Sequence, residues 1–270
     1  MTDMLNILYR DHHLIAIDKP AGLLVHRSDI DRHETRFAVQ LLRDQIGKRV
    51  HPVHRLDKGT SGVLLFAFEA SATRAVGAQF EAGDVHKTYL AVVRGWPPEE
   101  GSIDHALSRD QDDQGAALGI REAQAARTDY RVLARVELPQ SVDRYPTTRY
   151  ALVALNPVTG RRHQLRRHMK HIAHPVIGDA THGKGIHNRF FASQFGCDRL
   201  LLACIALRFR HPVTGGGMTI EAPLGDAFAD ICKQFSWSDI SGRITTGQSK
   251  YSGQCGVVDT APFPLQPSRG

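Results

Sequence analysis

Short apolar runs alternate with polar breaks along most of the chain, and they predict many strands and fewer helices. Unbroken runs rich in β-branched and aromatic residues favour buried strands, whereas apolar residues three or four positions apart favour helices. We expect helices at 35–48, 70–80, 160–172 and 227–235. We expect strands at 5–10, 13–19, 23–26, 63–68, 85–93, 124–136, 147–155, 200–209 and 218–221.

Two segments lack such runs. Residues 98–119 are polar and rich in Asp, Gln and Gly, which predicts a hairpin or a flexible insertion. From residue 238 onwards the chain consists largely of Gly, Ser, Thr and Pro. Such a segment buries too little apolar surface to offset its ordering entropy, so we expect 238–270 to be a disordered C-terminal tail.

Composition narrows the class of protein only moderately. Hydrophobic residues make up 41% and charged residues 23%, as in ordinary soluble proteins, and the net charge of +6 is consistent with a nucleic-acid partner. The four cysteines are scattered, which argues against a disulfide framework or a zinc site. No secretion signal and no membrane-spanning apolar stretch are apparent, so we expect a cytoplasmic protein without membrane contact.

Reactive residues gather in the segment His-Pro-Val-His-Arg-Leu-Asp-Lys-Gly-Thr-Ser-Gly at 51–62. Gly59 to Gly62 predict a turn, so Asp57 is expected on a tight loop before the buried run at 63–68. In an extended segment, Arg55 would leave the chain on the same face as Asp57 and keep its carboxylate ionised. A plainer interpretation makes Asp57 a turn cap with Arg55 as a surface ion pair.

A second basic segment, Thr-Gly-Arg-Arg-His-Gln-Leu-Arg-Arg-His, occupies 159–168, and Lys-Thr-Tyr occupies 87–89. The nine positions from His54 to Gly62 resemble the signature loop of the RluA-type pseudouridine synthases. The segment at 159–168 resembles that family's Gly-Arg-Thr-His-Gln-Ile-Arg-x-His, with Arg162 where Thr is usual. Together with weaker similarities, the resemblance covers roughly residues 5–236.

The resemblance implies a role for each matching residue. Asp57 is then the catalytic residue, Arg166 pairs with it, and Tyr89 lies in the pocket against the target base. Arg55 is a plausible wedge that fills the space left by a flipped base. The remaining candidates for RNA contact are His54, Arg161, His163 and Gln164.

The combined expectation for the fold is α+β: a mixed, mainly antiparallel sheet with flanking helices and a central basic cleft. Residues 1–237 would form one catalytic domain, without the small RNA-binding S4-like domain that precedes it in some relatives. We expect a monomer with RNA as its partner and no protein partner.

Histidines cluster at 163, 168, 171 and 174, which raises the possibility of a metal site. No carboxylate stands at a ligand-like spacing within this group, so we interpret the histidines as packing or RNA-facing residues. Pseudouridine formation neither gains nor loses atoms. We therefore expect no cofactor and no metal.

Within this family, the chain resembles most closely the members that modify a uridine in the T-stem of tRNA. The predicted activity is therefore isomerisation of a tRNA uridine to pseudouridine, and an rRNA-directed enzyme is the first alternative. A glycoside or nucleoside hydrolase would need a second carboxylate facing Asp57. A non-catalytic RNA-binding protein would leave the pairing of Asp57 with Arg166 without a purpose.

Overall fold

The computed structural model describes residues 4–27, 34–108 and 122–237. The expected tail at 238–270 lies outside the described residues, as does the second half, 109–119, of the expected insertion at 98–119. None of the helices in the part of the chain that the structure describes is both long and apolar enough to cross a membrane.

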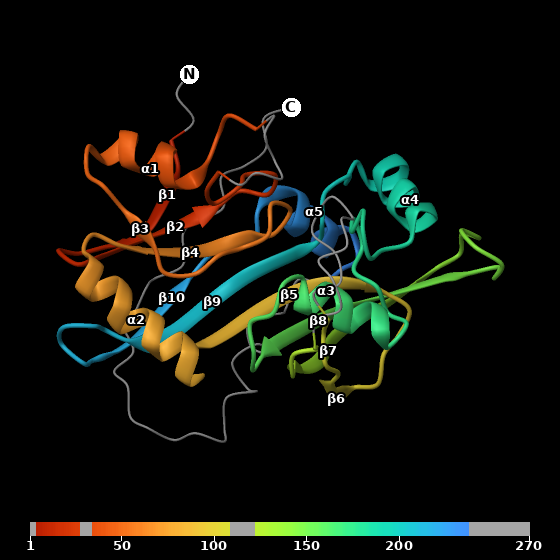
Figure 1. Cartoon of the computed structure of the whole chain (residues 1–270). Helices are drawn as coiled ribbons and strands as arrows, with labels where there is room; N and C mark the ends of the chain where they lie inside the picture. The colour runs from red at the N-terminus through yellow and green to blue at the C-terminus, as the bar shows by residue number, and fades with distance from the viewer. Residues whose placement is uncertain (1–3, 28–33, 109–121, 238–270) are drawn as a thin grey trace.

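A ten-stranded sheet runs through the molecule, with the strand order β1-β2-β4-β9-β5-β8-β7-β6 (Figure 1). In addition, β3 pairs with β4 and β10 pairs with β9. The strands are β1 Asn6–Arg10, β2 Leu14–Lys19, β3 His51–Pro52, β4 Ser61–Ala67, β5 His86–Arg94, β6 Glu100–Asp104, β7 Arg127–Leu138, β8 Thr148–Pro157, β9 Leu202–Arg210 and β10 Gly217–Glu221.

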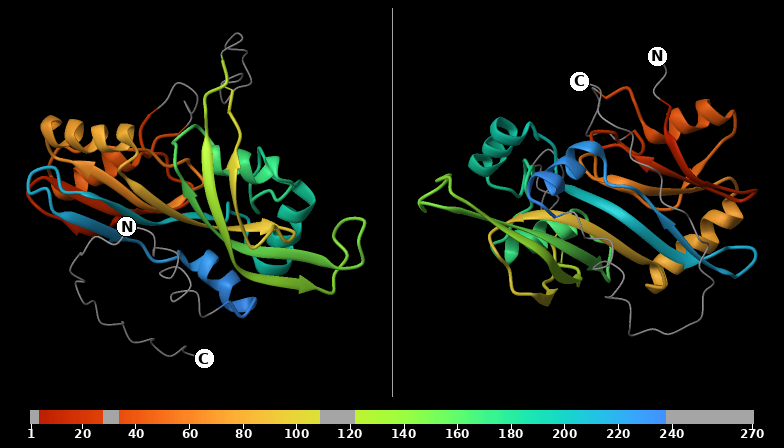
Figure 2. Two further views of the ribbon diagram at one scale, coloured as in Figure 1. Left: turned by 90° about the horizontal axis from the view of Figure 1, so that it is seen from below. Right: turned by 180° about the vertical axis from the view of Figure 1, so that it is seen from behind.

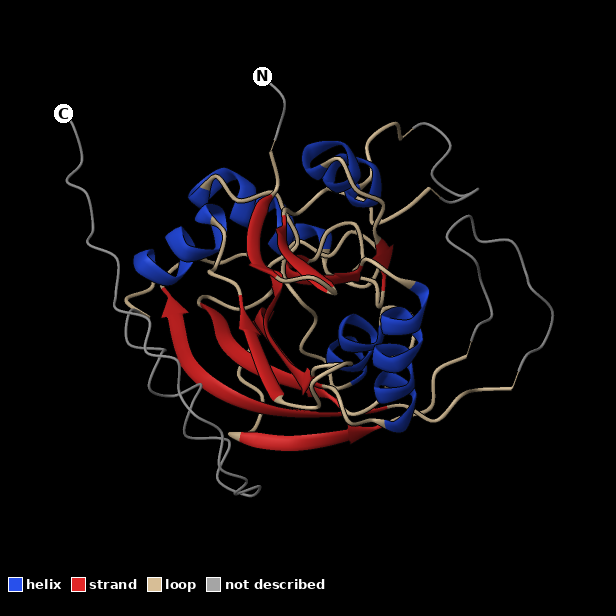
Figure 3. Cartoon of the chain, turned by 90° about the vertical axis from the view of Figure 1, so that its left-hand side faces the viewer, coloured by secondary structure: helices blue, strands red, loops and turns tan. Residues whose placement is uncertain are grey.

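Of the strand pairs in this sheet, β4 with β9 is parallel and the others are antiparallel. The sheet is strongly curved (Figure 3), and the hairpin of β7 and β8 extends beyond its edge (Figure 2). The mixed, mainly antiparallel sheet expected from the sequence is thus confirmed.

Five helices pack against the sheet: α1 Ala38–Ile46, α2 Ala70–Ala82, α3 Gln164–His171, α4 Gly185–Phe195 and α5 Asp226–Gln234. Successive residues of a strand point to opposite faces, and β5 supplies Tyr89, Ala91 and Val93 to one core but Leu90 and Val92 to another. Buried apolar residues of α1, α2 and α3 belong to the first core, and those of α4 and α5 to the second.

Three local predictions were wrong. The helix expected from residue 160 begins only at Gln164, because the preceding His163 adopts a left-handed conformation with φ 52°. The strand expected at 23–26 is reduced to a single bridge between Leu24 and Phe37. Helix α4 was not expected, although Phe190, Phe191 and Phe195 are spaced as on one helical face.

Candidate active site

Asp57 lies on the loop that leads from β3 into β4. The loop is closed by a hydrogen bond from the backbone N–H of Thr60 to the carbonyl of Asp57, at 3.0 Å. At the start of β4, Gly62 has φ 103° and faces the backbone of Cys204 on β9, so closely that a Cβ atom would overlap it. A glycine is therefore required there, and the loop is anchored where β4 meets β9.

Beneath this loop, Lys19 is completely buried. Its ammonium Nζ donates hydrogen bonds to the carbonyls of Pro20, Leu23 and Lys58, at 2.9, 2.7 and 3.2 Å. Burial lowers the pKa of Lys19 to about 7, although the charge of Asp57 acts in the opposite direction. Lys58 follows Asp57 directly. By bonding to the Lys58 carbonyl, Lys19 therefore fixes the backbone next to the candidate catalytic carboxylate.

The carboxylate of Asp57 faces helix α3. Arg166 Nη1 lies 3.2 Å from Asp57 Oδ2, so the contact expected between these two residues is present. The same guanidinium forms a bidentate pair with Asp179, at 2.7 Å from Nε and 2.8 Å from Nη2. Burial alone would raise the pKa of Asp179, but hydrogen bonds and charge from Arg166 lower it.

Arg55 does not hold Asp57 as the sequence suggested. In the described part of the chain, Asp57 forms its ion pair with Arg166 and has the His163 ring 4.0 Å away, while Arg55 is exposed at the edge of the cleft. Residues 55–57 are not part of a strand, and Leu56 between them is buried. The two-residue spacing therefore does not place both side chains on one face, and the predicted pair was wrong.

Two histidine rings lie in series next to Asp57: His163 is beside the carboxylate, and His182 bonds to His163. His163 Nε2 lies 4.0 Å from Asp57 Oδ2, and its Nδ1 is 3.1 Å from Nε2 of His182. Burial lowers the pKa of His163 to about 4, against the raising effect of Asp57. His163 is therefore a neutral imidazole beside the carboxylate at neutral pH.

Tyr89, on β5, forms part of the floor of the same cleft. It lies opposite Cys204 of β9 and Leu155 of β8 in the sheet, and only 9% of it is exposed. Burial raises the pKa of Tyr89 well above its ordinary value, so the phenol is neutral. Lys87, two residues earlier, also lines the cleft, and burial lowers its pKa.

Gln164 lines the cleft, but its amide bonds to protein groups. The oxygen accepts from the hydroxyl of Thr159 and the backbone N–H of Arg161, and the nitrogen donates to Arg127 and Thr128. Gln164 thereby joins the start of α3 to β7. The Arg161 guanidinium is exposed and donates to a backbone carbonyl, that of Ala125, at 3.1 Å.

His54 is also occupied by the protein. Its Nε2 accepts the backbone N–H of Leu65 at 3.1 Å, and its ring stacks on Phe80 with centroids 5.2 Å apart. Burial lowers the pKa of His54 to about 3, which keeps the ring neutral. These contacts make His54 a support of the loop, although it also lines the cleft.

These residues surround a cleft of about 1450 Å³. Among the described residues that line it, two carry carboxylates, Asp57 and Glu81. The lysines and arginines of its lining are Arg55, Lys87, Arg161, Arg162, Arg166 and Arg167. The cleft is thus rich in positive charge, as suits a polyanionic substrate.

The remaining histidines of the cluster pack within the protein. His168 bonds to Thr128 and to the carbonyl of His105, His171 stacks on the His105 ring, and His174 bonds to the carbonyl of Arg94. Across residues 4–27, 34–108 and 122–237, no group of three histidine, cysteine or acidic side chains is arranged to hold a metal ion.

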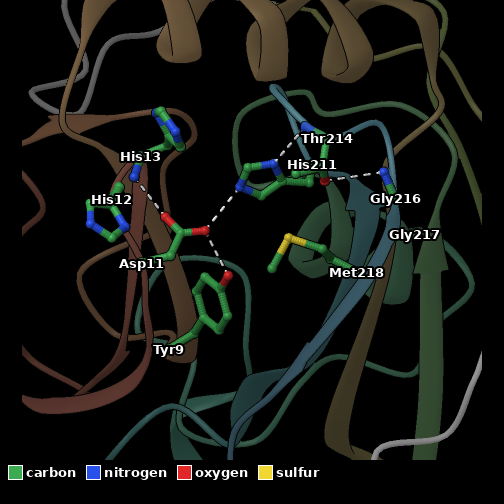
Figure 4. Close-up of a pocket in the computed structure, with 9 residues that line it drawn as sticks. All are labelled: Tyr9, Asp11, His12, His13, His211, Thr214, Gly216, Gly217 and Met218. Atoms are coloured by element: carbon green, nitrogen blue, oxygen red, sulfur yellow. Dashed lines mark hydrogen bonds and ion pairs between the residues drawn. The ribbon is translucent and has the colours of Figure 1, made fainter.

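A second hollow, of about 380 Å³, shares no residue with the cleft (Figure 4). It lies between the turns β1–β2 and β9–β10. Asp11 accepts hydrogen bonds from the hydroxyl of Tyr9 at 2.6 Å and from Nε2 of His211 at 2.9 Å. The His211 Nδ1 accepts backbone N–H groups of its own turn. These bonds join the two turns to each other.

Sequence reasoning missed Lys19, Asp179 and His182 as members of the site. Lys19 is the last residue of the strand expected at 13–19, and the apolar pattern of that strand gives it no separate role. Asp179 lies within the range of the family resemblance, 5–236, but outside the segments to which that resemblance gives a role. A buried carboxylate near a buried arginine would have been the signal, and burial was not visible from the sequence.

Comparison with known proteins agrees with this geometry. Residues 13–171 match the family model of RNA pseudouridylate synthase. The chain is 49% identical over 236 residues to "tRNA pseudouridine synthase C" of Vibrio vulnificus (strain CMCP6), covering 87% of this chain and 96% of that protein. It is 51% identical over 234 residues to the protein of the same name from Haemophilus ducreyi (strain 35000HP / ATCC 700724), covering 86% and 96%.

Solved structures show the same fold. The human RNA pseudouridylate synthase domain containing 4 aligns with a TM-score of 0.65 and 25% identity, over 86% of this chain and 93% of that one. The human RNA pseudouridylate synthase domain containing 1 aligns with a TM-score of 0.64 and 26% identity, over 83% and 84%. The sequence motifs, the cleft around Asp57 and these matches lead to one conclusion: the chain belongs to the RNA pseudouridylate synthase family.

Proposed function

We propose that the protein isomerises a uridine in the T-stem of tRNA to pseudouridine, with Asp57 as the catalytic residue. The observation that carries the proposal is the position of the Asp57 carboxylate. It lies in a basic cleft, is oriented by Arg166 and shares the cleft lining with Tyr89. The relatives named tRNA pseudouridine synthase C support tRNA as the substrate.

The reaction breaks the N1–C1′ bond of uridine, turns the uracil and joins C5 to C1′. The hydrogen at C5 leaves as a proton and N1 gains one, so the product is an isomer of the substrate. The Asp57 carboxylate serves as a nucleophile at the ribose or the base, or as a base at the ribose. Reaching it requires the uridine to leave the RNA stack, at a cost of a few kcal/mol.

The surrounding residues suit an extruded base. Tyr89 is a neutral, rigidly held aromatic ring on which a uracil would stack. Arg55, exposed at the cleft edge, is free of Asp57 and placed to fill the vacated position in the RNA. We propose that Arg161, with its exposed guanidinium, contacts RNA phosphate. His163 contributes a neutral ring beside the carboxylate, and His54 and Gln164 support the cleft walls.

A hydrolase would use two opposed carboxylates. Among the described residues that line the cleft, Glu81 is the other acid, and it lies exposed at the end of α2. Asp179 is engaged with Arg166. The single oriented carboxylate therefore favours isomerisation.

Tritium release tests the proposal directly. Transcripts of tRNA and rRNA labelled at uridine C5 are incubated with wild type, Asp57→Asn and, as a control, Asp143→Asn, which changes an exposed turn. Forming the C5–C1′ bond must release the label. We expect release from tRNA by wild type and Asp143→Asn, and none by Asp57→Asn. Release from rRNA alone would overturn the tRNA assignment, and release by Asp57→Asn would overturn the catalytic assignment.

We further propose that residues 1–237 form one catalytic domain that acts in the cytoplasm as a monomer, with RNA as its partner and without a metal or cofactor. Activity in EDTA after exhaustive dialysis tests the last point. Sedimentation of the free protein tests the oligomeric state, and a chain ending at Trp237 should keep wild-type activity.

A further inference from the structure

Asp179 is an acidic group at the site to which the proposed function gives no role. It lies between α3 and α4 and is 2% exposed. Besides the two bonds from Arg166, its Oδ1 accepts the backbone N–H groups of Thr181 and His182, at 2.9 and 2.8 Å. A buried carboxylate with four donors is firmly fixed in position.

The guanidinium of Arg166 is divided unequally between two carboxylates. Its Nε and Nη2 edge meets Asp179 in a bidentate pair, at 2.7 and 2.8 Å. A single nitrogen, Nη1, reaches Asp57, at 3.2 Å. Because the guanidinium is planar, the bidentate pair with Asp179 sets the direction in which Nη1 points. Asp179 therefore determines how Arg166 meets Asp57.

Asp179 also reaches Asp57 by a second route. It holds the backbone N–H of His182, whose ring bonds to His163 at 3.1 Å, and His163 lies 4.0 Å from Asp57. Within the described residues, Asp57 forms its ion pair with Arg166, and the neutral His163 ring lies beside the same carboxylate. Both are thus held in place from the same buried carboxylate.

We propose that Asp179 is a positioning residue for the isomerisation, which holds Arg166 directly and His163 through His182 against the carboxylate of Asp57. This inference rests on the proposed function, in which Asp57 is catalytic. Asp179 also balances the charge of Arg166. Without Asp179, the positive charge of Arg166 would be neutralised by Asp57 alone. The stronger ion pair would make the Asp57 carboxylate less reactive.

The opposing interpretation is that the Arg166–Asp179 pair only stabilises the connection between α3 and α4. Both interpretations predict that Asp179→Asn destabilises the fold, because a buried guanidinium loses its partner. They differ in what happens to the chemical step in protein that remains folded, and in whether the effect passes through Arg166.

The first experiment measures single-turnover rate and RNA dissociation constant separately, for wild type and Asp179→Asn, below the unfolding temperature of each. We expect the rate to fall on the order of 10²-fold while the dissociation constant changes less than about threefold, since the lost interaction orients a reacting group. A rate within about threefold of wild type, or a loss confined to RNA affinity, would overturn the proposal.

The double variant that combines Asp179→Asn with Arg166→Met tests whether Asp179 acts through Arg166. If Asp179 acts through Arg166, then Asp179→Asn adds less than about threefold to the loss already caused by Arg166→Met. Losses that multiply would show that Asp179 acts independently, against the proposal.

A third comparison does not depend on the folding of Asp179→Asn. His182→Ala removes the second route at a half-exposed position, and Lys184→Ala is the matched control at an exposed position of the same loop. We expect His182→Ala to slow the single turnover several-fold, roughly 5- to 10-fold, and Lys184→Ala to leave it unchanged. A wild-type rate for His182→Ala overturns the proposal. An inactive wild type, or an active Asp57→Asn, would instead overturn the proposed function and this inference with it.

Discussion

Replacing Lys19 by Met should change how stability depends on pH. In the folded protein, burial lowers the pKa of Lys19 from 10.5 to about 7. Between these two values the unfolded chain binds a proton at Lys19 that the folded chain does not. The free energy of unfolding of the wild type should therefore rise with pH relative to Lys19→Met.

The magnitude follows from the same two values. The full change in the pKa of Lys19, from 10.5 to about 7, corresponds to roughly 5 kcal/mol at about 1.4 kcal/mol per pKa unit. From pH 7.5 to 9.5, the wild type should gain roughly 2 to 3 kcal/mol over Lys19→Met. Added to this is the cost of the hydrogen bonds from Nζ to buried carbonyls that the variant loses.

Urea unfolding, followed by tryptophan fluorescence at pH 7.5, 8.5 and 9.5, measures this difference. Lys233→Met, at an exposed position of α5, is the control and should show no pH-dependent difference from wild type. A constant difference between wild type and Lys19→Met across the three pH values would refute the reasoning. Since Lys19 holds the carbonyl of Lys58 beside Asp57, the variant should also lose activity at all three pH values.

Two further predictions concern the anchoring of the fold. Gly62→Ala should cost more than about 3 kcal/mol, because its φ is 103° and a Cβ would overlap the backbone of β9. Gly77→Ala, in the open middle of α2, should instead stabilise by about 0.5–1 kcal/mol, and equal melting temperatures for the two variants would contradict this. In the second hollow, burial would raise the pKa of Asp11, but hydrogen bonds, first from Tyr9, lower it from 3.8 to about 2. This carboxylate should therefore contribute roughly 2 kcal/mol above pH 4, lost as the pH falls towards 2. The stability difference between wild type and Asp11→Asn should shrink from pH 5 to pH 2.5, and an undiminished difference would count against the assignment.

The sequence was informative where function depends on consecutive residues. The loop around Asp57 is short and unusual in composition, so it was recognisable by itself. The basic segment around Arg166 alone would favour a solvated helix face, and it indicated a site only together with that loop. Their contact joins residues 109 positions apart, and it was expected from the family resemblance alone. The strands were predictable because apolar runs are a property of local sequence, and their order in the sheet is not.

What was missed depends on burial. A lysine at the end of a strand is normally exposed, and Lys19 becomes a buried anchor only because the carbonyl of Lys58, 39 positions away, is brought over it. Gln164 was expected to contact RNA, yet folding places its amide between α3 and β7, where protein groups occupy it. The displacement of Arg55 from Asp57 likewise follows from a loop shape that residue spacing does not encode.

The position of β9 in the sheet has a consequence for biosynthesis. Strand β9 is synthesised after β4 and β5, yet it lies between these two strands, which are neighbours in sequence. Until β9 has been synthesised, the parts of the sheet that carry Asp57 and Tyr89 have no strand between them, and Arg199 has not yet bonded to Ser61, 138 positions earlier. Contacts this distant in sequence form slowly. A growing chain on the ribosome therefore stays inactive, with two unpaired sheet edges, until β9 has been synthesised.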